Sequence, residues 1–342
     1  MTRFRQRGLV IAWAPYQEYC AGLARQLDLP VRWVHYLGFQ RPLVAPLKLP
    51  LQTARTAWLL WRERPAVVVV QVPPAYAPLV PALYAALTGA GFIMDTHSQT
   101  FLIARWRWAL PLVRWLARRA LAVLVTNAHL AATVRAWGAR AIVAVSPPPP
   151  LPPLAPRRPA AQFTVAFPCS FEPDEPVEAV LGAARALPDV RFVITGNHRK
   201  RPGLRASAPP NVELTGYLPR AAFYQRLRDA NALLVLTTLE HTILQGALEG
   251  LELGQPLILS DTALLRAYFT EAAVYVPNTA DGIAAGVRAA RAREAQLRAA
   301  VQALRPQRRA EWEAARAAIA ALIDARWAAA PPARPALQRT AS

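Results

Sequence analysis

The residues with the clearest chemical potential lie between Asn231 and Asp261, in the stretch NALLVLTTLEHTILQGALEGLELGQPLILSD. A short apolar run closes on two threonines followed by Glu240 and His241. A helical pattern then extends to Gly254, and a second apolar run follows it. This order predicts a strand, a polar turn, a helix and a second parallel strand. Ligands of such units bind beyond the carboxyl ends of the strands, where helix N-termini present free N–H groups to anions.

Glu249 falls inside this predicted helix, close enough to its start to reach a ligand bound there. A carboxylate accepts two hydrogen bonds from a vicinal diol, and the start of a helix suits a phosphate. The segment therefore predicts a site for a sugar carried on a nucleotide diphosphate. A solvated acid in a purely structural βαβ unit is the alternative.

Composition limits the class of protein. A chain of 342 residues suits two domains, each large enough for its own core. It has no apolar run of the roughly 18 residues that span a bilayer, and the run at 9–14 is too short for a signal peptide. Cys20 and Cys169 lie far apart without metal-ligand spacing, which predicts neither a zinc site nor a disulfide framework. We expect a reducing, cytoplasmic compartment.

The formal net charge of +19 is unevenly distributed. Residues 1–171 hold 19 of the 40 Lys and Arg residues but only four of the 21 acids, and no acid lies between Asp95 and Glu172. Such a field attracts polyanions, among them nucleic acid, anionic lipid headgroups and pyrophosphate-bearing substrates. Genome bias explains the preference for Arg over Lys, but it does not explain the missing acids. Nucleic acid is not expected as a partner, because the chain has no recognition helix or RNA-binding motif.

Apolar runs and helical patterns alternate along most of the chain. The nearly pure valine run at 66–70 is typical of a parallel strand buried on both faces. The alternation stops at residues 146–159, whose prolines permit no regular element, and restarts near Phe163. We predict an α/β fold with two Rossmann-like domains, joined by this spacer, and a ligand-binding cleft between the domains.

The predicted domains are residues 1–150 and 151–305. An Ala/Arg/Glu pattern runs from Ala280 to Trp327 and is divided by Pro306. It predicts a C-terminal helix over 306–327 that packs back toward the first domain. The Pro- and Ala-rich residues 328–342 are expected to be disordered.

Several stretches, in their order along the chain, resemble the GT-B glycosyltransferases, in particular the bacterial group 1, or family-four, type. The similar stretches are residues 95–98 (DTHS), 125–145 (VTNAHLAATVRAWGARAIVAV), 191–197 (RFVITGN), 211–219 (NVELTGYLP) and 237–261 (TTLEHTILQGALEGLELGQPLILSD). The resemblance covers about residues 8–325 and rests on the order and spacing of these motifs. It implies a metal-independent hexosyltransferase that moves a sugar from a nucleotide diphosphate to a lipid-linked or cell-surface glycan, without a cofactor.

The resemblance also implies roles for single residues. In the family a Glu on the helix after the TTLEH-like turn binds the ribose hydroxyls, and Glu249 holds the matching position. The family's first acid precedes that Glu with seven residues between them. Here Glu240 is one residue too far away and His241 stands at the usual distance, so either one takes the place beside the sugar. The residues expected to begin the helix and bind the diphosphate through their N–H groups are Thr242, Ile243 and Leu244.

Cations for the leaving diphosphate are expected from the loop after Gly196, because the chain has no DxD-type metal motif. The candidates there are His198, Arg199, Lys200 and Arg201, and a solvated basic loop is the alternative. The family's other basic residue, a Lys after the first strand of the second domain, is missing, and residues 169–176 read CSFEPDEP with three acids. This departure keeps an alternative open: a relative that is not a transferase, such as a nucleotide-sugar epimerase or a catalytically lost scaffold.

His97 is the candidate on the acceptor side. It follows a predicted strand at 92–95, and in similar enzymes a histidine there lies near the sugar being transferred. Asp95 either orients His97 or caps the following turn. Pro15 and Tyr16, in the first strand-to-helix loop, are expected to line the cleft at a place where relatives carry glycines.

Residues 101–121, FLIARWRWALPLVRWLARRAL, have a separate expected role. On a helical wheel Arg107, Arg114 and Arg118 cluster, and Pro111 is expected near the start of the helix. The opposite side carries the apolar residues Trp106, Val113 and Leu116. Basic residues with Trp at amphipathic spacing predict contact with an anionic membrane surface, on the inner face of the membrane. Core packing explains the apolar residues equally well.

Overall fold

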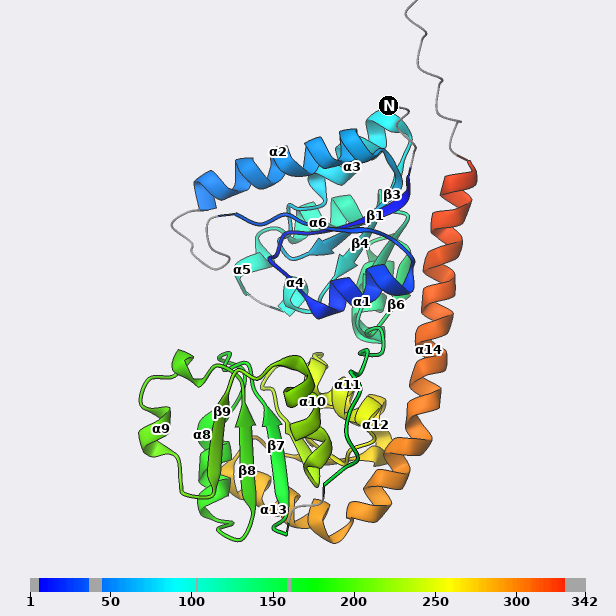
Figure 1. Ribbon diagram of the computed structural model, residues 1–342. Helices are drawn as coiled ribbons and strands as arrows, with labels where there is room; N and C mark the ends of the chain where they lie inside the picture. Colours follow the sequence, from blue (N-terminus) through cyan, green and yellow to red (C-terminus); the bar gives the residue numbers. More distant parts are fainter. Residues whose placement is uncertain (1–5, 37–44, 103, 159–160, 330–342) are drawn as a thin grey trace, which may run out of the picture. The chain divides into compact units, whose positions relative to one another are not determined.

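The computed structural model describes residues 6–36, 45–102, 104–158 and 161–329 (Figure 1). The chain divides into two compact units, Met1–Pro147 with Trp312–Ser342, and Pro148–Glu311. Each unit contains one parallel six-stranded sheet with helices on both faces. The predicted architecture of two Rossmann-like α/β domains is therefore confirmed.

The sheet of the first unit has the order β2-β1-β3-β4-β5-β6. Its strands are β1 (Gln6–Ala12), β2 (Val31–Trp33), β3 (Pro65–Val72), β4 (Gly91–Thr96), β5 (Ala122–Val125) and β6 (Ala141–Val143). Every residue of β3 and β4 is buried, as expected for central strands of a parallel sheet. The strand order reverses between β1 and β3, and the loops after these strands lie where doubly wound sheets bind ligands.

Helices cover both faces of this sheet. Val68 and Val70 face a layer that contains α2 (Ala45–Glu63), α3 (Leu79–Thr88), α6 (Leu110–Ala117) and α7 (Ala128–Ala136). Val67 and Val69 face α1 (Glu18–Gln26) and the last part of α14 (Glu294–Ala328). The alternation follows from the two-residue period of a strand, which sends successive side chains to opposite faces.

The sheet of the second unit has the order β12-β11-β10-β7-β8-β9, which reverses between β7 and β10. Its strands are β7 (Thr164–Pro168), β8 (Arg191–Thr195), β9 (Val212–Gly216), β10 (Ala232–Val235), β11 (Leu257–Ser260) and β12 (Ala273–Val276). Leu234 and Ile258 pack with α8 (Val177–Arg185) and α13 (Ala280–Ala292), whereas Leu233 and Leu257 lie against α11 (Gln245–Leu253). The remaining elements of this unit are η2 (His198–Lys200), α9 (Leu204–Ser207), α10 (Arg220–Asp229), α12 (Ala263–Phe269) and η3 (Thr270–Ala272).

The C-terminal helix begins earlier than the sequence predicts. α14 starts at Glu294 and continues through Pro306, and the break from α13 falls at Arg293, whose φ of −116° and ψ of 20° leave the helical range. Proline costs a helix one hydrogen bond. Burial of apolar residues on both sides of Pro306, such as Val301 and Ile319, offsets that cost. Of the predicted disordered tail at 328–342, all but the first two residues lie outside the described residues.

The described part of residues 101–121 contributes to three short helices, α4 (Gln99–Leu102), α5 (Ala104–Arg107) and α6. Val113 and Leu116 are fully buried, and Trp106 packs against the same core. The predicted apolar side of this segment therefore packs against the protein core, as in the alternative interpretation of these residues. The large apolar residues that the segment leaves exposed are Trp108 and Trp115. None of the helices in the described part of the chain combines the length and apolar character needed to cross a bilayer.

Candidate functional site

The candidate donor site lies at the carboxyl ends of β7 and β10, where the strand order of the second unit reverses. The loops after these strands are joined: Thr237 Oγ1 donates to Asp174 Oδ2 over 2.7 Å, and the Thr238 N–H donates to the Asp174 carbonyl over 2.8 Å. A Cβ atom on Gly246 would lie 2.8 Å from Pro168 Cγ. The glycine thus lets the first turn of α11 approach the end of β7 closely.

Glu249 lies in the second turn of α11 and is only 9% exposed. The Tyr224 hydroxyl on α10 donates to Glu249 Oε1 over 3.1 Å. A carboxylate has about four lone-pair sites, so it can accept hydrogen bonds from several hydroxyl groups at once. The neighbouring Glu252 is used differently, because Arg309 Nε on α14 donates to Glu252 Oε1 over 3.1 Å. Of the two acids, Glu249 is the one suited to a ligand.

α11 begins three residues later than the sequence predicts. Thr242, Ile243 and Leu244 precede it and belong to no helix or strand. Leu244 is the N-cap, with φ −76° and ψ 146°, and the helix opens at Gln245. The chain turns at His241, whose φ is 59°, and the β-branched Thr242 and Ile243 favour extended backbone. The N–H groups that open the helix therefore start with Gln245 rather than with the predicted residues.

Glu240 and His241 form the turn between β10 and α11. Glu240 is exposed, and its Oε1 accepts the Ala263 N–H over 3.2 Å at the start of α12. This bond directs Glu240 toward α12. His241 is partly buried and leads directly into the segment before α11.

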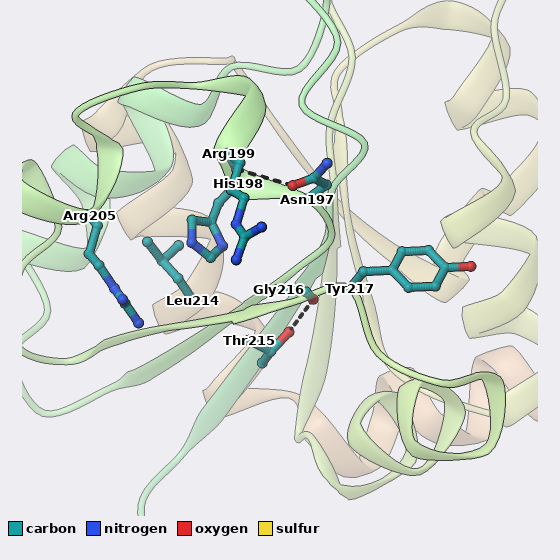
Figure 2. A pocket seen from close by; sticks show the side chains of 8 residues that line it. All are labelled: Asn197, His198, Arg199, Arg205, Leu214, Thr215, Gly216 and Tyr217. Carbon is teal, nitrogen blue, oxygen red and sulfur yellow. Dashed lines mark hydrogen bonds between the residues drawn. The ribbon is translucent and has the colours of Figure 1, made fainter. Parts of the chain in front are cut away.

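The basic residues after β8 lie against two different parts of the second unit: the loop after β7 and a pocket at the ends of β8 and β9. Lys200 Nζ donates to the Ser170 carbonyl over 2.9 Å and pairs with Glu172 Oε1 at 2.7 Å, so it joins the loop after β7. His198 and Arg199 line a pocket instead (Figure 2). The sequence predicts a single group of basic residues. In the structure Lys200 contacts the loop after β7, whereas His198 and Arg199 line the pocket.

This pocket has a volume of about 570 Å³ and opens at the ends of β8 and β9 (Figure 2). Its lining residues are Asn197, His198, Arg199, Arg205, Leu214, Thr215, Gly216 and Tyr217. The volume lies in the range of small-ligand sites, and two guanidinium groups suit an anionic ligand. Figure 2 shows the Tyr217 side chain pointing away from the basic residues. Arg205 and Tyr217 were not predicted; Tyr217 stands in the NVELTGYLP motif, whereas no sequence signal marks Arg205.

Gly196 brings the loops after three strands together. Its φ is +108°, and a Cβ atom there would lie 1.9 Å from the Cys169 carbonyl oxygen after β7. Its N–H donates to the Gly216 carbonyl at the end of β9 over 3.0 Å. Only glycine fits this close backbone approach. Gly196 therefore lets the basic loop, residues 197–201 after β8, begin close to the ends of β7 and β9.

The three acids after β7 have structural partners. Glu172 pairs with Lys200, and Asp174 is bound by the two threonines after β10. Glu175 is 5% exposed and accepts the N–H groups of Ser170 and Glu172 and the Ser170 hydroxyl. The three acids thus stabilise the conformation of the loop after β7. This loop has no Lys of its own, but Lys200, which follows β8, places a cation beside it.

The first unit has a polar cluster at the carboxyl end of β4. Asp95 is 3% exposed and accepts a hydrogen bond of 3.1 Å from the Tyr19 hydroxyl. His97 Nε2 lies 3.7 Å from Asp95 Oδ2 and 3.4 Å from Gln71 Nε2, and the Tyr19 ring packs edge-on against the imidazole. Asp95 Oδ2 therefore lies beside His97 but beyond hydrogen-bond distance of Nε2.

Burial is the largest influence on the pKa values of Asp95 and Tyr19. It raises the pKa of Asp95, against the opposing effects of His97 and the hydrogen bond from Tyr19. Burial, followed by the nearby Asp95 carboxylate, raises the pKa of the Tyr19 phenol well above its usual range. Tyr19 thus remains a proton donor at neutral pH. An imidazole beside a buried carboxyl group is an arrangement that can accept a proton from a hydroxyl.

Pro15 and Tyr16 follow β1 at the same edge of the first sheet, and both are exposed. The Tyr16 hydroxyl donates to Glu18 Oε2 over 2.6 Å, and its ring packs on Trp33 with 5.3 Å between centroids. The predicted acceptor-side residues thus lie in the first unit and the predicted donor-side residues in the second. Across the described ranges, no group of three or more His, Cys, Asp or Glu side chains is arranged to hold a metal ion.

Sequence comparison finds no matching family model and no matching curated protein. Solved structures match the fold. Sucrose-phosphate synthase from Thermosynechococcus elongatus is similar with a TM-score of 0.71 and 15% identity, over 95% of this chain and 100% of that one. Anabaena HepE, in complex with UDP and glucose, is similar with a TM-score of 0.69 and 13% identity, over 94% of this chain and 100% of that one.

A putative UDP-N-acetylglucosamine 2-epimerase from Listeria monocytogenes also shares the fold, with a TM-score of 0.63 and 11% identity over 95% of this chain and 98% of that one. At such identities the likeness concerns the fold alone. The chain has the GT-B architecture of two Rossmann-like domains. The similar structures include glycosyltransferases and this one protein described as a nucleotide-sugar epimerase.

Proposed function

We propose that this protein is a glycosyltransferase of the bacterial group 1 type that uses a nucleotide-diphosphate sugar. The observation that supports this most directly is Glu249, which lies on α11, the helix that starts at the switch point of the second sheet. Its carboxylate is largely buried and accepts a hydrogen bond from Tyr224 on α10. Its position suits the ribose diol of a nucleotide. Because HepE is solved with UDP-glucose, a uridine nucleotide is the first donor to test.

In the proposed binding mode, the diphosphate lies at the first turn of α11 and near the pocket after β8. The N–H groups from Gln245 onward, the His198 side chain and the Arg199 guanidinium would stabilise the charge that develops on the leaving group. The charge is thus neutralised by side chains and a helix terminus, which is the basis for proposing a metal-independent hexosyltransferase.

The reacting sugar is assigned to His241 and His97. His241 leads into α11 on the donor side, whereas Glu240, the alternative, is bound to the start of α12. His97, which lies beside Asp95, is the proposed group near the transferred sugar on the acceptor side. The acceptor is proposed to be a lipid-linked or cell-surface glycan at the inner face of the membrane, since the acid-poor first unit suits a pyrophosphate carrier.

A thermal-shift panel of UDP-, GDP-, ADP- and CDP-sugars tests the proposal. We expect one nucleotide class to raise the Tm, because a ligand that binds only the folded state stabilises it. Donor consumption should then require a glycan or lipid-linked acceptor. If no nucleotide sugar changes the Tm, or if Glu249→Ala leaves the shift unchanged, the assignment is wrong.

A nucleotide-sugar epimerase is the second candidate. Two observations favour it: the acid-rich loop after β7 has no Lys of its own, and an epimerase shares the fold. An epimerase changes the stereochemistry of the donor sugar without an acceptor, which proton NMR of the donor and protein alone detects. A transferase leaves the donor configuration unchanged under those conditions.

A further inference from the structure

Helix α2 buries two polar residues beside Leu59 and Leu60, and it exposes several large apolar residues. Gln52 and Thr56 are buried, and both are hydrogen-bonded inside the first unit: Gln52 Nε2 donates to the Val34 carbonyl over 2.9 Å, and Trp13 Nε1 donates to Thr56 Oγ1 over 2.9 Å. A helix at the surface of a soluble domain normally shows the opposite arrangement. The outward face of α2 therefore calls for a physical explanation.

That outward face carries an apolar stripe. Its members are the exposed residues Leu47, Leu51, Ala54, Trp58 and Trp61. They are spaced alternately four and three residues apart, which places them on one side of the helix. The stripe runs along nearly the whole helix, and it does not contribute to the core that Leu59 and Leu60 enter from the opposite side.

α3 extends the surface. It lies beside α2 (Figure 1) and exposes three leucines at positions 79, 83 and 87. We call the combined surface the α2–α3 face, formed by Leu47, Leu51, Trp58, Trp61, Leu79, Leu83 and Leu87. These are seven of the 13 large apolar residues that are exposed in the described part of the chain. Exposed apolar surface is thus concentrated here, which marks an interaction site.

Cations border the stripe along one flank. Lys48, Arg55 and Arg62 recur every seven residues on α2. The guanidinium carbons of Arg55 and Arg62 lie 4.2 and 4.8 Å from the centre of the Trp58 ring. Tryptophan with Arg and Lys beside an apolar stripe matches the chemistry of a lipid headgroup region, where apolar bodies are buried and cations meet phosphates.

We propose that the α2–α3 face docks on the surface of an anionic lipid bilayer. Its Trp and Leu side chains would enter the headgroup region, and the three flanking cations would meet the lipid phosphates. A second copy of the chain fits less well, because it would bring two cationic flanks together. The only acid in α2 and α3 is Glu63, which already pairs with Arg32 at 2.7 Å. The proposal is independent of the proposed sugar transfer.

Flotation of the purified full chain with vesicles tests the proposal. We expect binding to vesicles of phosphatidylcholine with phosphatidylglycerol, and much weaker binding to phosphatidylcholine alone. Trp58→Ser with Trp61→Ser should lower the vesicle partition coefficient by roughly tenfold or more, through loss of apolar contact. Arg55→Gln with Arg62→Gln should lower it by about fivefold per charge at low salt, and added salt should reduce the wild-type binding.

Matched variants on other surfaces serve as controls. Trp327→Ser removes an exposed Trp from α14, and Arg288→Gln with Arg291→Gln removes the same charge from α13. Both should keep wild-type partitioning, and circular dichroism should show all variants folded. Undiminished vesicle binding by the Trp58/Trp61 variant overturns the proposal, as does equal binding to neutral vesicles. Self-association in solution that the same variant abolishes also overturns it, since the face is then a contact between copies.

Discussion

The phenol of Tyr224 on α10 and the carboxylate of Glu249 on α11 are joined by a hydrogen bond of 3.1 Å. Both side chains are largely buried, so the phenol restrains the carboxylate before any ligand arrives. An acid held in this way loses less conformational freedom when it binds hydroxyl groups.

We expect Glu249→Ala to weaken nucleotide-sugar binding by about 1–3 kcal/mol, because hydrogen bonds to a charged acceptor are lost. Tyr224→Phe keeps the carboxylate but removes its partner, so its loss should be smaller, about 0.5–1.5 kcal/mol. Titration calorimetry with the donor found in the thermal-shift panel measures both. Wild-type affinity in Glu249→Ala rules out the ribose assignment.

Arg199 and Lys200 are adjacent but should behave differently. Arg199 lines the pocket after β8, whereas Lys200 is held by Glu172 and the Ser170 carbonyl. Arg199→Ala should weaken nucleoside-diphosphate binding by about 1.5–3 kcal/mol, through loss of a charge-assisted bond. Lys200→Ala should change the free energy of unfolding by at most about 1 kcal/mol, because its ion pair is exposed. If Lys200→Ala lost as much affinity for the nucleoside diphosphate as Arg199→Ala, this difference between the two residues would be contradicted.

His97→Ala should lower turnover by roughly 100-fold or more while donor affinity stays close to that of the wild type. The reason is that His97 lies in the first unit, whereas the proposed donor contacts lie in the second. Steady-state kinetics and calorimetry on the same preparation separate the two effects. A parallel fall in turnover and donor affinity would place His97 in donor binding instead.

Asp95→Asn tests the titration of the buried cluster. The folded-state pKa of Asp95 is raised above 3.8 by burial, so the folded chain keeps this proton at pH values where the unfolded chain has lost it. The free energy of unfolding of the wild type should therefore fall, relative to that of the variant, as pH rises above about 3.8. Denaturant unfolding across pH 3 to about 7 measures the difference. A constant difference would show that Asp95 titrates alike in both states.

Gly196→Ala and Gly254→Ala separate backbone strain from steric conflict. Both glycines have positive φ, of 108° and 70°, but only the Cβ atom at position 196 would collide with a carbonyl, that of Cys169. Gly254→Ala should cost about 1 kcal/mol in the free energy of unfolding, and Gly196→Ala at least about twice that. Gly196→Ala should also weaken nucleotide binding, because the basic loop must shift. Equal destabilisation would mean that the loop relaxes freely.

The fold was largely predictable because its strands are buried on both faces and read as apolar runs. The valine run at 66–70 lies within β3, and the proline-rich stretch contains the division after Pro147. Helix boundaries were less predictable. Pro306 lies inside α14, because packing on both sides of it outweighs one lost hydrogen bond, and the sequence alone does not show that packing.

The positions of candidate residues in the fold were predictable where they follow from one rule: parallel sheets bind ligands beyond the carboxyl ends of their strands. It placed His97 and Asp95 at the end of β4 and the basic loop after β8. It did not predict which way adjacent cations turn, since Lys200 faces Glu172 and Arg199 the pocket. Arg205 was missed because its approach to the pocket depends on the path of the chain through α9, which carries no motif.

α14 completes the first unit from the far end of the chain. Trp312, Ile319 and Ile323 pack against the sheet face that contains Val67 and Ile93. During synthesis on a ribosome, the part of that face that α14 covers, beside α1, stays uncovered until the entire second unit has been translated. A nascent or truncated chain that stops before Trp312 would expose this apolar sheet face to aggregation or to chaperones.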